Sequence, residues 1–279
     1  MVTTQKMQHW YDYITINIYW FAINTRNGVL APLLIPLLVQ QFVGDEVKGA
    51  YVGTIRLWAL MSAVLVQALM GMLSDRSTSR WGRRRPFILG GTLGELAAFT
   101  LIGLTIGMQG MSGFWALFAA YLISMFFSNS AQAAQQGLIP DLVPDEKKGR
   151  FSGVKALLEV PLPLIFISFV IGRLVSAGNL WAALVITMAV LLICMLVTML
   201  VREQPVTEAP FELNWKPFTR LVLMAGLFTG IILIAGEAVN RSMQLIQNLQ
   251  HGSSIILIAL AGTAGMLLAI GFGVWASIR

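Results

Sequence analysis

Long apolar runs separated by short polar segments dominate this chain. The runs are continuous rather than alternating, which favours helices over half-buried strands. About 20 apolar residues in a helix cross the roughly 30 Å hydrocarbon layer of a bilayer, and a helix pairs its own backbone polar groups there. The pattern predicts eight spanning helices, at residues 13–39, 50–73, 86–108, 114–139, 154–176, 180–201, 218–247 and 254–277.

The polar segments between these runs suggest how the helices are grouped. The longest segment follows the sixth predicted span. We therefore expect an N-terminal six-helix bundle at residues 1–201, a cytoplasmic linker at 202–217, and the first two helices of a second bundle at 218–279. The predicted fold class is an all-α membrane protein.

Composition agrees with a lipid environment. Apolar residues make up 57% of the chain and charged residues 11%, whereas a soluble domain carries about 25% charged residues. The N-terminus lacks the pattern of a cleavable signal peptide, and the single cysteine, Cys194, excludes an intrachain disulfide. The net charge of +6 reflects the loops of a membrane protein, so we expect no nucleic-acid partner.

Basic residues in the short loops predict the orientation. With the N-terminus inside, fourteen Lys and Arg side chains fall on the cytoplasmic side and three on the other. We expect a multi-pass protein of the cell membrane with a cytoplasmic N-terminus. The cytoplasmic set is Lys6, Arg76, Arg80, Arg83, Arg84, Arg85, Lys147, Lys148, Arg150, Lys155, Arg202, Lys216, Arg220 and Arg279; the opposite set is Lys48, Arg173 and Arg241.

The loop between the second and third spans holds a spaced motif, GMLSDRSTSRWGRRRP, at residues 71–86. Its arginines alone would anchor the loop on the cytoplasmic side. That role does not explain Gly71, Asp75 and Gly82. We expect Gly71 to allow close approach of another helix. Asp75 lies at a helix C-terminus, where the helix dipole disfavours an anion, so it requires a specific partner; local candidates are Arg76, Arg80 and Arg83.

This motif resembles the conserved loop of the major facilitator superfamily. Residues 80–87, RWGRRRPF, narrow the resemblance to the branch of sucrose transporters and glycoside–pentoside–hexuronide cation symporters, and residues 140–150 and 201–205 agree with it. The resemblance implies that the acid and the loop arginines latch two helical bundles together. The residues that match this latch are Gly71, Asp75, Arg76, Arg80, Gly82, Arg83 and Arg84.

Charged residues inside predicted spans are candidates for ion coupling, because they are costly in lipid. Arg26 and Glu95 should each have a polar partner within the bundle, either each other or another group. Glu159 lies nearer a span end, where a structural role is the alternative. Glu237 and Arg241 are four residues apart with the acid first, which also suits an ion pair within one helix.

Uncharged amides mark one face of the fourth span. Asn129, Gln132 and Gln136 follow i, i+3, i+7 spacing. They could line a polar cavity for a hydroxyl-rich solute or join helices by hydrogen bonds. We expect Gln132 and Gln136, but not Gln135, to point into the bundle interior and line a water-accessible cavity.

In the first span, Asn17, Asn24 and Gly28 share a face from which Arg26 is turned away, and Asn24 is a further candidate solute contact. The branch resemblance also has departures. The sugar-binding arginine of sucrose transporters falls on Gln136, and their membrane aspartate falls near Met125. Both departures weaken the prediction that sucrose is the substrate. With the aspartate absent, Glu95 becomes the best candidate for proton coupling.

Two functions are consistent with these features. One is cation-coupled transport of a small polar solute, most simply a sugar or glycoside, by alternating access, with a proton or sodium as the second ligand. The other is an accessory or assembly subunit of a membrane complex, such as a photosynthetic pigment–protein complex. The chain stops after the predicted eighth span, so the length of the native reading frame would discriminate them. We expect no enzymatic activity, cofactor or metal, since no nucleotide loop or Cys/His cluster is present.

Overall fold

The structure is a computed structural model that describes residues 9–203, 215–216, 218–227, 229–230 and 234. The protein is an all-α membrane protein, and its described residues contain six helical segments long and apolar enough to cross a bilayer. These segments confirm the first six predicted spans to within a few residues at most ends. They are Asp12–Val43, Lys48–Asp75, Arg85–Thr105, Gly110–Leu142, Asp145–Ser176 and Leu180–Thr198.

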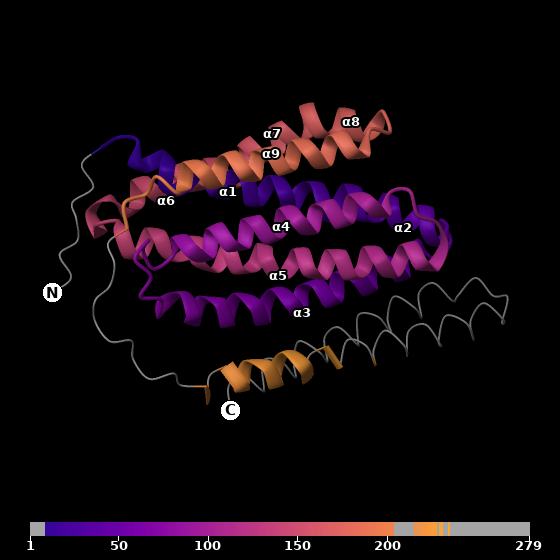
Figure 1. Cartoon of the computed structure of the whole chain (residues 1–279), viewed down its shortest axis with the longest axis horizontal. Helices are drawn as coiled ribbons and strands as arrows, with labels where there is room; N and C mark the ends of the chain where they lie inside the picture. Colours follow the sequence, from indigo (N-terminus) through magenta and orange to yellow (C-terminus); the bar gives the residue numbers. More distant parts are fainter. Residues whose placement is uncertain (1–8, 204–214, 217, 228, 231–233, 235–279) are drawn as a thin grey trace, which may run out of the picture. The chain divides into compact units, whose positions relative to one another are not determined.

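Four of the spans are single helices: α3 (Lys48–Asp75), α4 (Arg85–Thr105), α5 (Gly110–Leu142) and α9 (Leu180–Thr198). Figure 1 shows α4 beside α5 and α3 along the other side of α5. Glycines permit the α4–α5 contact. A Cβ atom at Gly91 would lie 2.7 Å from the Phe127 carbonyl oxygen and 2.8 Å from the Ala131 Cβ. Small residues at such positions let membrane helices approach closely.

The first span is interrupted by prolines. It comprises α1 (Asp12–Val29), the π-helical turn η1 (Leu30–Leu34) and α2 (Ile35–Val43). Pro36 has no backbone N–H, so it cannot bond to the Ala31 carbonyl in the wider π-helical register. Arg56 on α3 donates to that carbonyl oxygen at 3.3 Å. The arginine thereby satisfies a carbonyl that the proline leaves without a donor.

The fifth span is interrupted twice. It comprises α6 (Asp145–Glu159), α7 (Pro161–Phe166), the π-helical turn η2 (Ile167–Ile171) and α8 (Gly172–Ser176). α1 packs against α6, α7 and α9, so it lies at the centre of the contacts made by the fifth and sixth spans. Buried aromatic and aliphatic side chains, including Tyr19 and Phe151, fill this part of the core.

Polar side chains tie together the loop at residues 76–84, the last turn of α5 and the residues after α9. We call this the arginine-rich end of the bundle; Figure 1 shows it on the left. Residues Met1–Leu213 form one compact unit and Asn214–Arg279 another. In the second unit, Phe218–Leu227 is an apolar helix. Glu237, Arg241 and the predicted eighth span lie outside the described residues, and the domain boundaries 201/202 and 217/218 stay predictions.

Candidate functional site

A buried ion pair joins the first and third spans. Arg26 of α1 places its Nε 2.5 Å from Glu95 Oε1 of α4, and both side chains are almost inaccessible, at 3% and 1% exposure. The remaining guanidinium nitrogens donate to Ser124 Oγ at 2.9 Å and Asn27 Oδ1 at 2.8 Å, and the group lies 5.9 Å from the Tyr121 ring centroid. Arg26 and Glu95 were each expected to have a polar partner, and they are partners of each other.

The surroundings of Glu95 are polar and dry. Tyr19 and Thr92, both buried, share a hydrogen bond of 2.6 Å one turn from Glu95. Thr92 Oγ1 also donates to the Ile88 carbonyl oxygen at 2.7 Å, so the Tyr19 hydroxyl is the donor in the shared bond. The Ser124 hydroxyl thus bonds to the ion pair directly, and the Tyr19–Thr92 hydrogen bond lies one turn away.

The three glutamines of α5 differ in burial. Gln135 is the buried glutamine, and its Nε2 donates to the Ile16 carbonyl oxygen of α1 at 2.6 Å. Gln132 is half-buried and Gln136 is exposed. The helix turn places Gln135 on the α1 side, and the expectation that Gln132 and Gln136 point into the bundle interior stays a prediction. Whether Gln132 and Gln136 line a cavity stays a prediction.

Asn129, the third amide of the predicted face of α5, joins α5 to α3. Asn129 accepts from Gln67 Nε2 of α3 at 2.8 Å and donates to the Met125 carbonyl oxygen at 2.6 Å. The structure therefore places Asn129 in a contact between spans, while a role toward solute stays a prediction. Gln67 was not among the sequence candidates, although its position inside a predicted span was a signal that could have found it.

The predicted face of α1 is largely a packing surface. Asn17 is buried and donates to the Phe151 carbonyl oxygen at 3.2 Å. A Cβ atom at Gly28 would meet the Ile167 side chain at 2.5 Å. Asn24 is half-buried, and its Nδ2 donates to the Trp20 carbonyl oxygen at 3.0 Å. Asn24 and Gly28 keep partial access. Asn24, which carries the polar side chain, remains the candidate.

Lys155, assigned from the sequence to the cytoplasmic side, packs against a tryptophan of α1 in the structure. Its ammonium group lies 3.9 Å from the centroid of the Trp20 ring, well inside the first span. Glu159, one turn later on α6, has its carboxylate 3.8 Å from the same ammonium. The side of the membrane on which Lys155 lies stays a prediction; in the sequence it falls just inside the predicted span 154–176.

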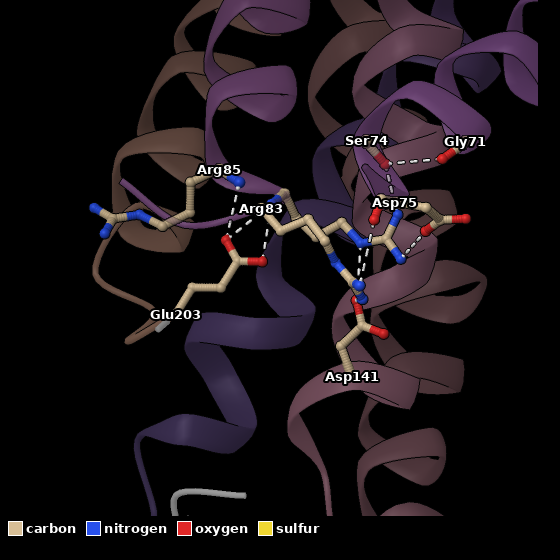
Figure 2. A network of polar contacts seen from close by, with 8 residues as sticks. Gly71, Ser74, Asp75, Arg83, Arg85, Asp141 and Glu203 are labelled. Carbon is tan, nitrogen blue, oxygen red and sulfur yellow. Dashed lines mark hydrogen bonds and ion pairs between the residues drawn. The ribbon is translucent and has the colours of Figure 1, made fainter. Parts of the chain in front are cut away.

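A second charged network occupies the arginine-rich end. Arg84 is buried, pairs with Asp75, and places its Nε 2.8 Å from Asp141 Oδ2 and its Nη1 2.5 Å from Ser74 Oγ. Arg83 Nη2 lies 2.5 Å from the same Asp141 oxygen. Figure 2 shows Asp75 and Asp141 on opposite sides of the arginine side chains. One guanidinium group therefore bridges the ends of α3 and α5.

Two residues of the predicted latch, Asp75 and Arg84, form an ion pair with each other. Asp75 does have a local partner, but its ion pair is with Arg84, which was not among the three expected partners. Arg83 reaches only the Asp75 carbonyl oxygen, at 3.5 Å. Within the described residues, a Cβ at Gly71 would meet nothing within 4 Å, so the expected close approach there stays a prediction. Latching by Arg76 and Arg80 stays a prediction.

Glu203, in the segment after α9, adds a carboxylate to this network. Its carboxylate oxygens accept from the backbone N–H of Arg84 at 2.8 and 2.9 Å, and Oε2 accepts from that of Arg85 at 3.2 Å. Gly82 has φ +102°, and a Cβ there would lie 2.6 Å from the Glu203 Cβ. Glycine is therefore required both for the turn and for the approach of the carboxylate.

Burial raises the pKa of Glu203, while the N–H groups of Arg84 and Arg85 and the Arg84 charge oppose that rise. This contact has no direct signal in the sequence, because Glu203 lies 119 residues from Arg84. The sequence signal for Glu203 was its place in the stretch 201–205, which resembles the family pattern.

The match to a known protein family covers more of the chain than this bundle. Residues 18–279 match the family model described as Major Facilitator Superfamily. A lactose permease of Lactobacillus helveticus is 26% identical over 159 residues, covering 52% of this chain and 24% of the relative. A proton-associated sugar transporter A of Mus musculus is 35% identical over 92 residues, covering 32% and 12%.

A sucrose transport protein of Arabidopsis thaliana is 28% identical over 222 residues, covering 66% of this chain and 35% of the relative. The chain thus spans about a third or less of the length of each of these relatives. The resemblance to the branch that contains sucrose and lactose transporters is confirmed.

Proposed function

Because this chain belongs to the Major Facilitator Superfamily, we propose that it is part of a secondary transporter that moves a sugar or glycoside together with a proton by alternating access. The relatives named for lactose, sucrose and proton-associated sugar transport support the substrate class. Sodium is the alternative coupling ion. Transport rather than enzymatic chemistry is the activity that this family membership supports.

The observation that carries proton coupling is the buried pair of Arg26 and Glu95. Two opposite charges in a water-poor interior are stable only together, because removing one partner leaves the other charge unpaired at a cost of about 3–5 kcal/mol. A proton added to Glu95 neutralises its charge and leaves Arg26 without its counterion. The bundle must then rearrange so that Arg26 gains water or another anion.

This requirement supports coupling to a conformational change. Arg26 also donates to Ser124 on α5, and its Nη2 lies 3.3 Å from the Met125 sulfur. Met125 and Gln132 are half-buried on α5, seven residues apart and so on one helix face. A change at the ion pair would therefore act on α5 beside the candidate solute-binding face of Gln132 and Gln136.

Reconstitution of the full-length protein in proteoliposomes tests this function. Uptake of radiolabelled lactose, sucrose and a methyl glucoside should be measured with no gradient, with an inward proton gradient and with an inward sodium gradient. We expect accumulation of at least one sugar only when protons are driven inward. The absence of sugar uptake under all three conditions would contradict the proposal, and accumulation with sodium alone would replace the coupling ion.

A further inference from the structure

One guanidinium group at the arginine-rich end forms no ion pair within the part of the chain that the structure describes. Asp75 and Asp141 pair with the two arginines that precede Arg85. The Arg85 Nη2 donates instead to the Met199 carbonyl oxygen, and its Nε is buried without a partner among the described residues. Figure 2 shows the Arg85 side chain directed away from both aspartates. Arg85 therefore keeps donor capacity that the described protein groups do not use.

Arg85 lies where the ends of two neighbouring spans meet. It is the first residue of α4, and Met199 directly follows the last residue of α9. The two helices also meet at their other ends, where a Cβ atom at Gly103 would collide with the Trp181 ring. α4 and α9 therefore run side by side in opposite directions (Figure 1), and Arg85 covers one end of the seam between them.

The surface beside this end of α9 is apolar and exposed. α9 is the most apolar of the six described spans, and only 33% of its most apolar stretch is buried. Leu196 in its last turn and Leu200 just beyond it are 55% and 71% exposed. Leu93, two turns into α4, is 50% exposed. Such leucines on spanning helices suit contact with acyl chains, which are equally apolar.

Two further arginines give this end a surplus of positive charge. Arg80 and Arg202 are exposed, and neither forms an ion pair with another described residue. The nearby carboxylate of Glu203 is occupied by backbone N–H groups, including that of Arg85. Trp81 is 64% exposed, and tryptophan is enriched at the level of lipid headgroups. Basic and aromatic side chains therefore lie next to a surface suited to lipid.

We propose that Trp81, Arg85, Leu200 and Arg202, which we call the α4–α9 end, bind an anionic phospholipid. A guanidinium group donates parallel N–H bonds to phosphate oxygens, and Arg85 and Arg202 supply two such groups. The acyl chains would extend along Leu200 and the other exposed leucines. Basic groups between spanning helices on the cytoplasmic side of a membrane are typical sites for anionic headgroups. The proposal goes beyond transport and does not depend on which solute is carried.

The charges at this end favour an anionic headgroup over a zwitterionic one. A zwitterionic headgroup also carries an ammonium or choline group, for which a free carboxylate is the natural partner. Asp75 and Asp141 are paired with arginines, and Glu203 accepts from backbone N–H groups. The described carboxylates of this network are therefore already bound, whereas the guanidinium groups of Arg85 and Arg202 lack a counterion.

A lipid bound there would strengthen the joint between α4 and the segment after α9. Arg202 immediately precedes Glu203, whose carboxylate bonds to the start of α4. A headgroup held by both Arg85 and Arg202 would bridge the same two segments. Because a ligand that binds only the folded state stabilises it, the proposal predicts that anionic phospholipid raises the unfolding temperature.

Thermal unfolding of the purified full-length protein in detergent micelles tests the α4–α9 end. The micelles contain increasing mole fractions of phosphatidylglycerol, or of phosphatidylcholine with the same acyl chains. Phosphatidylglycerol should raise the unfolding midpoint to a plateau, and phosphatidylcholine should not. Glycerol phosphate, which has the anionic group without acyl chains, should give no rise, because it lacks the contact with the leucines.

Substitutions locate the effect. Arg202→Gln should raise the mole fraction of phosphatidylglycerol needed for half-maximal stabilisation by about fivefold, the loss expected for one basic residue at a membrane surface. Arg150→Gln is the matched control, because Arg150 is exposed on α6 and forms no ion pair with another described residue. It removes the same charge and should change nothing. Arg85→Gln should have a larger effect; if it does not fold, Arg202→Gln decides alone.

Three results would overturn the proposal. Equal weakening by Arg202→Gln and Arg150→Gln would show that lipid responds only to the net charge of the protein. Equal stabilisation of the wild type by phosphatidylcholine would refute selection of an anionic headgroup. Stabilisation by glycerol phosphate as large as that by phosphatidylglycerol would replace the lipid by a free phosphate ester.

Discussion

At the scale of single residues, Glu203 holds the segment after α9 against the N-terminus of α4. Its carboxylate accepts from consecutive backbone N–H groups of Arg84 and Arg85, and a helix N-terminus favours an anion. Burial nevertheless raises the pKa of Glu203. The desolvation of the carboxylate therefore outweighs the hydrogen bonds that stabilise its charge.

The raised pKa predicts the sign of a pH effect. Glu203 has a higher pKa folded than unfolded, so its contribution to stability is largest below the unfolded pKa, about 4.3, and is lost as the pH rises through the folded pKa. The stability of the wild type minus that of Glu203→Gln should therefore fall between about pH 4 and pH 7. Thermal unfolding in detergent checks this, with Glu146→Gln as the exposed control. A difference that grows with pH would contradict it.

Arg84 predicts a second residue-scale effect. A Cβ at Gly137 of α5 would collide with the Arg84 guanidinium group. Gly137→Ala should displace Arg84 from Asp75 and Asp141 and lower stability by about 1–3 kcal/mol, because a buried charge loses its partners. Gly90→Ala is the control, since a Cβ there meets nothing within 4 Å. Equal unfolding midpoints for the two variants would show that Arg84 is not held as described.

The residue-scale site was only partly predictable from sequence. Arg26 and Glu95 were found because charges inside apolar runs are conspicuous, and their pairing followed from the cost of burying either alone. Glu203 was missed as a contact because it lies far along the chain from Arg84. The contact between Lys155 and Trp20 was not predicted, because Lys155 was considered only as an orientation signal. The bond from Gln135 to Ile16 was not predicted, because spacing defines a helix face but not which neighbour that face meets.

At the scale of elements, α4 and α5 are held together by close approach rather than by charges. Gly91→Ala would place a methyl group within 2.8 Å of Ala131 and the Phe127 carbonyl oxygen. Overpacking of this kind costs about 1–3 kcal/mol, so the unfolding midpoint should fall. The neighbouring Gly90→Ala faces open space and should not lower it. A loss of stability in Gly90→Ala but not in Gly91→Ala would mean that α4 is rotated from the orientation described.

Element positions were the most predictable part of the fold. Apolar runs located the six spans, since only helices pair their backbone within lipid. The interruptions at η1, at Val160 and at η2 were not predicted. Pro36, Pro161 and Pro163 indicate missing donors, but the sequence does not say whether a helix bends, widens into a π-turn or breaks.

At the scale of the whole molecule, loop charges predict that the arginine-rich end faces the cytoplasm. Single cysteines can test this in a Cys194→Ser background. Asp45→Cys, at the opposite end of the bundle, should react with an impermeant maleimide added to intact cells. Ser77→Cys, in the loop at residues 76–84, should react only after permeabilisation. The reverse pattern would invert the topology.

In the proposed mechanism, protonation of Glu95, the partner of Arg26, couples the proton gradient to sugar movement. The most direct measurement compares accumulation with exchange in proteoliposomes that contain full-length Glu95→Gln. The substitution mimics the protonated side chain, so we expect gradient-driven accumulation to be lost while exchange of labelled for unlabelled sugar persists. Glu146→Gln should retain both. Undiminished proton-driven accumulation by correctly folded Glu95→Gln would contradict the account.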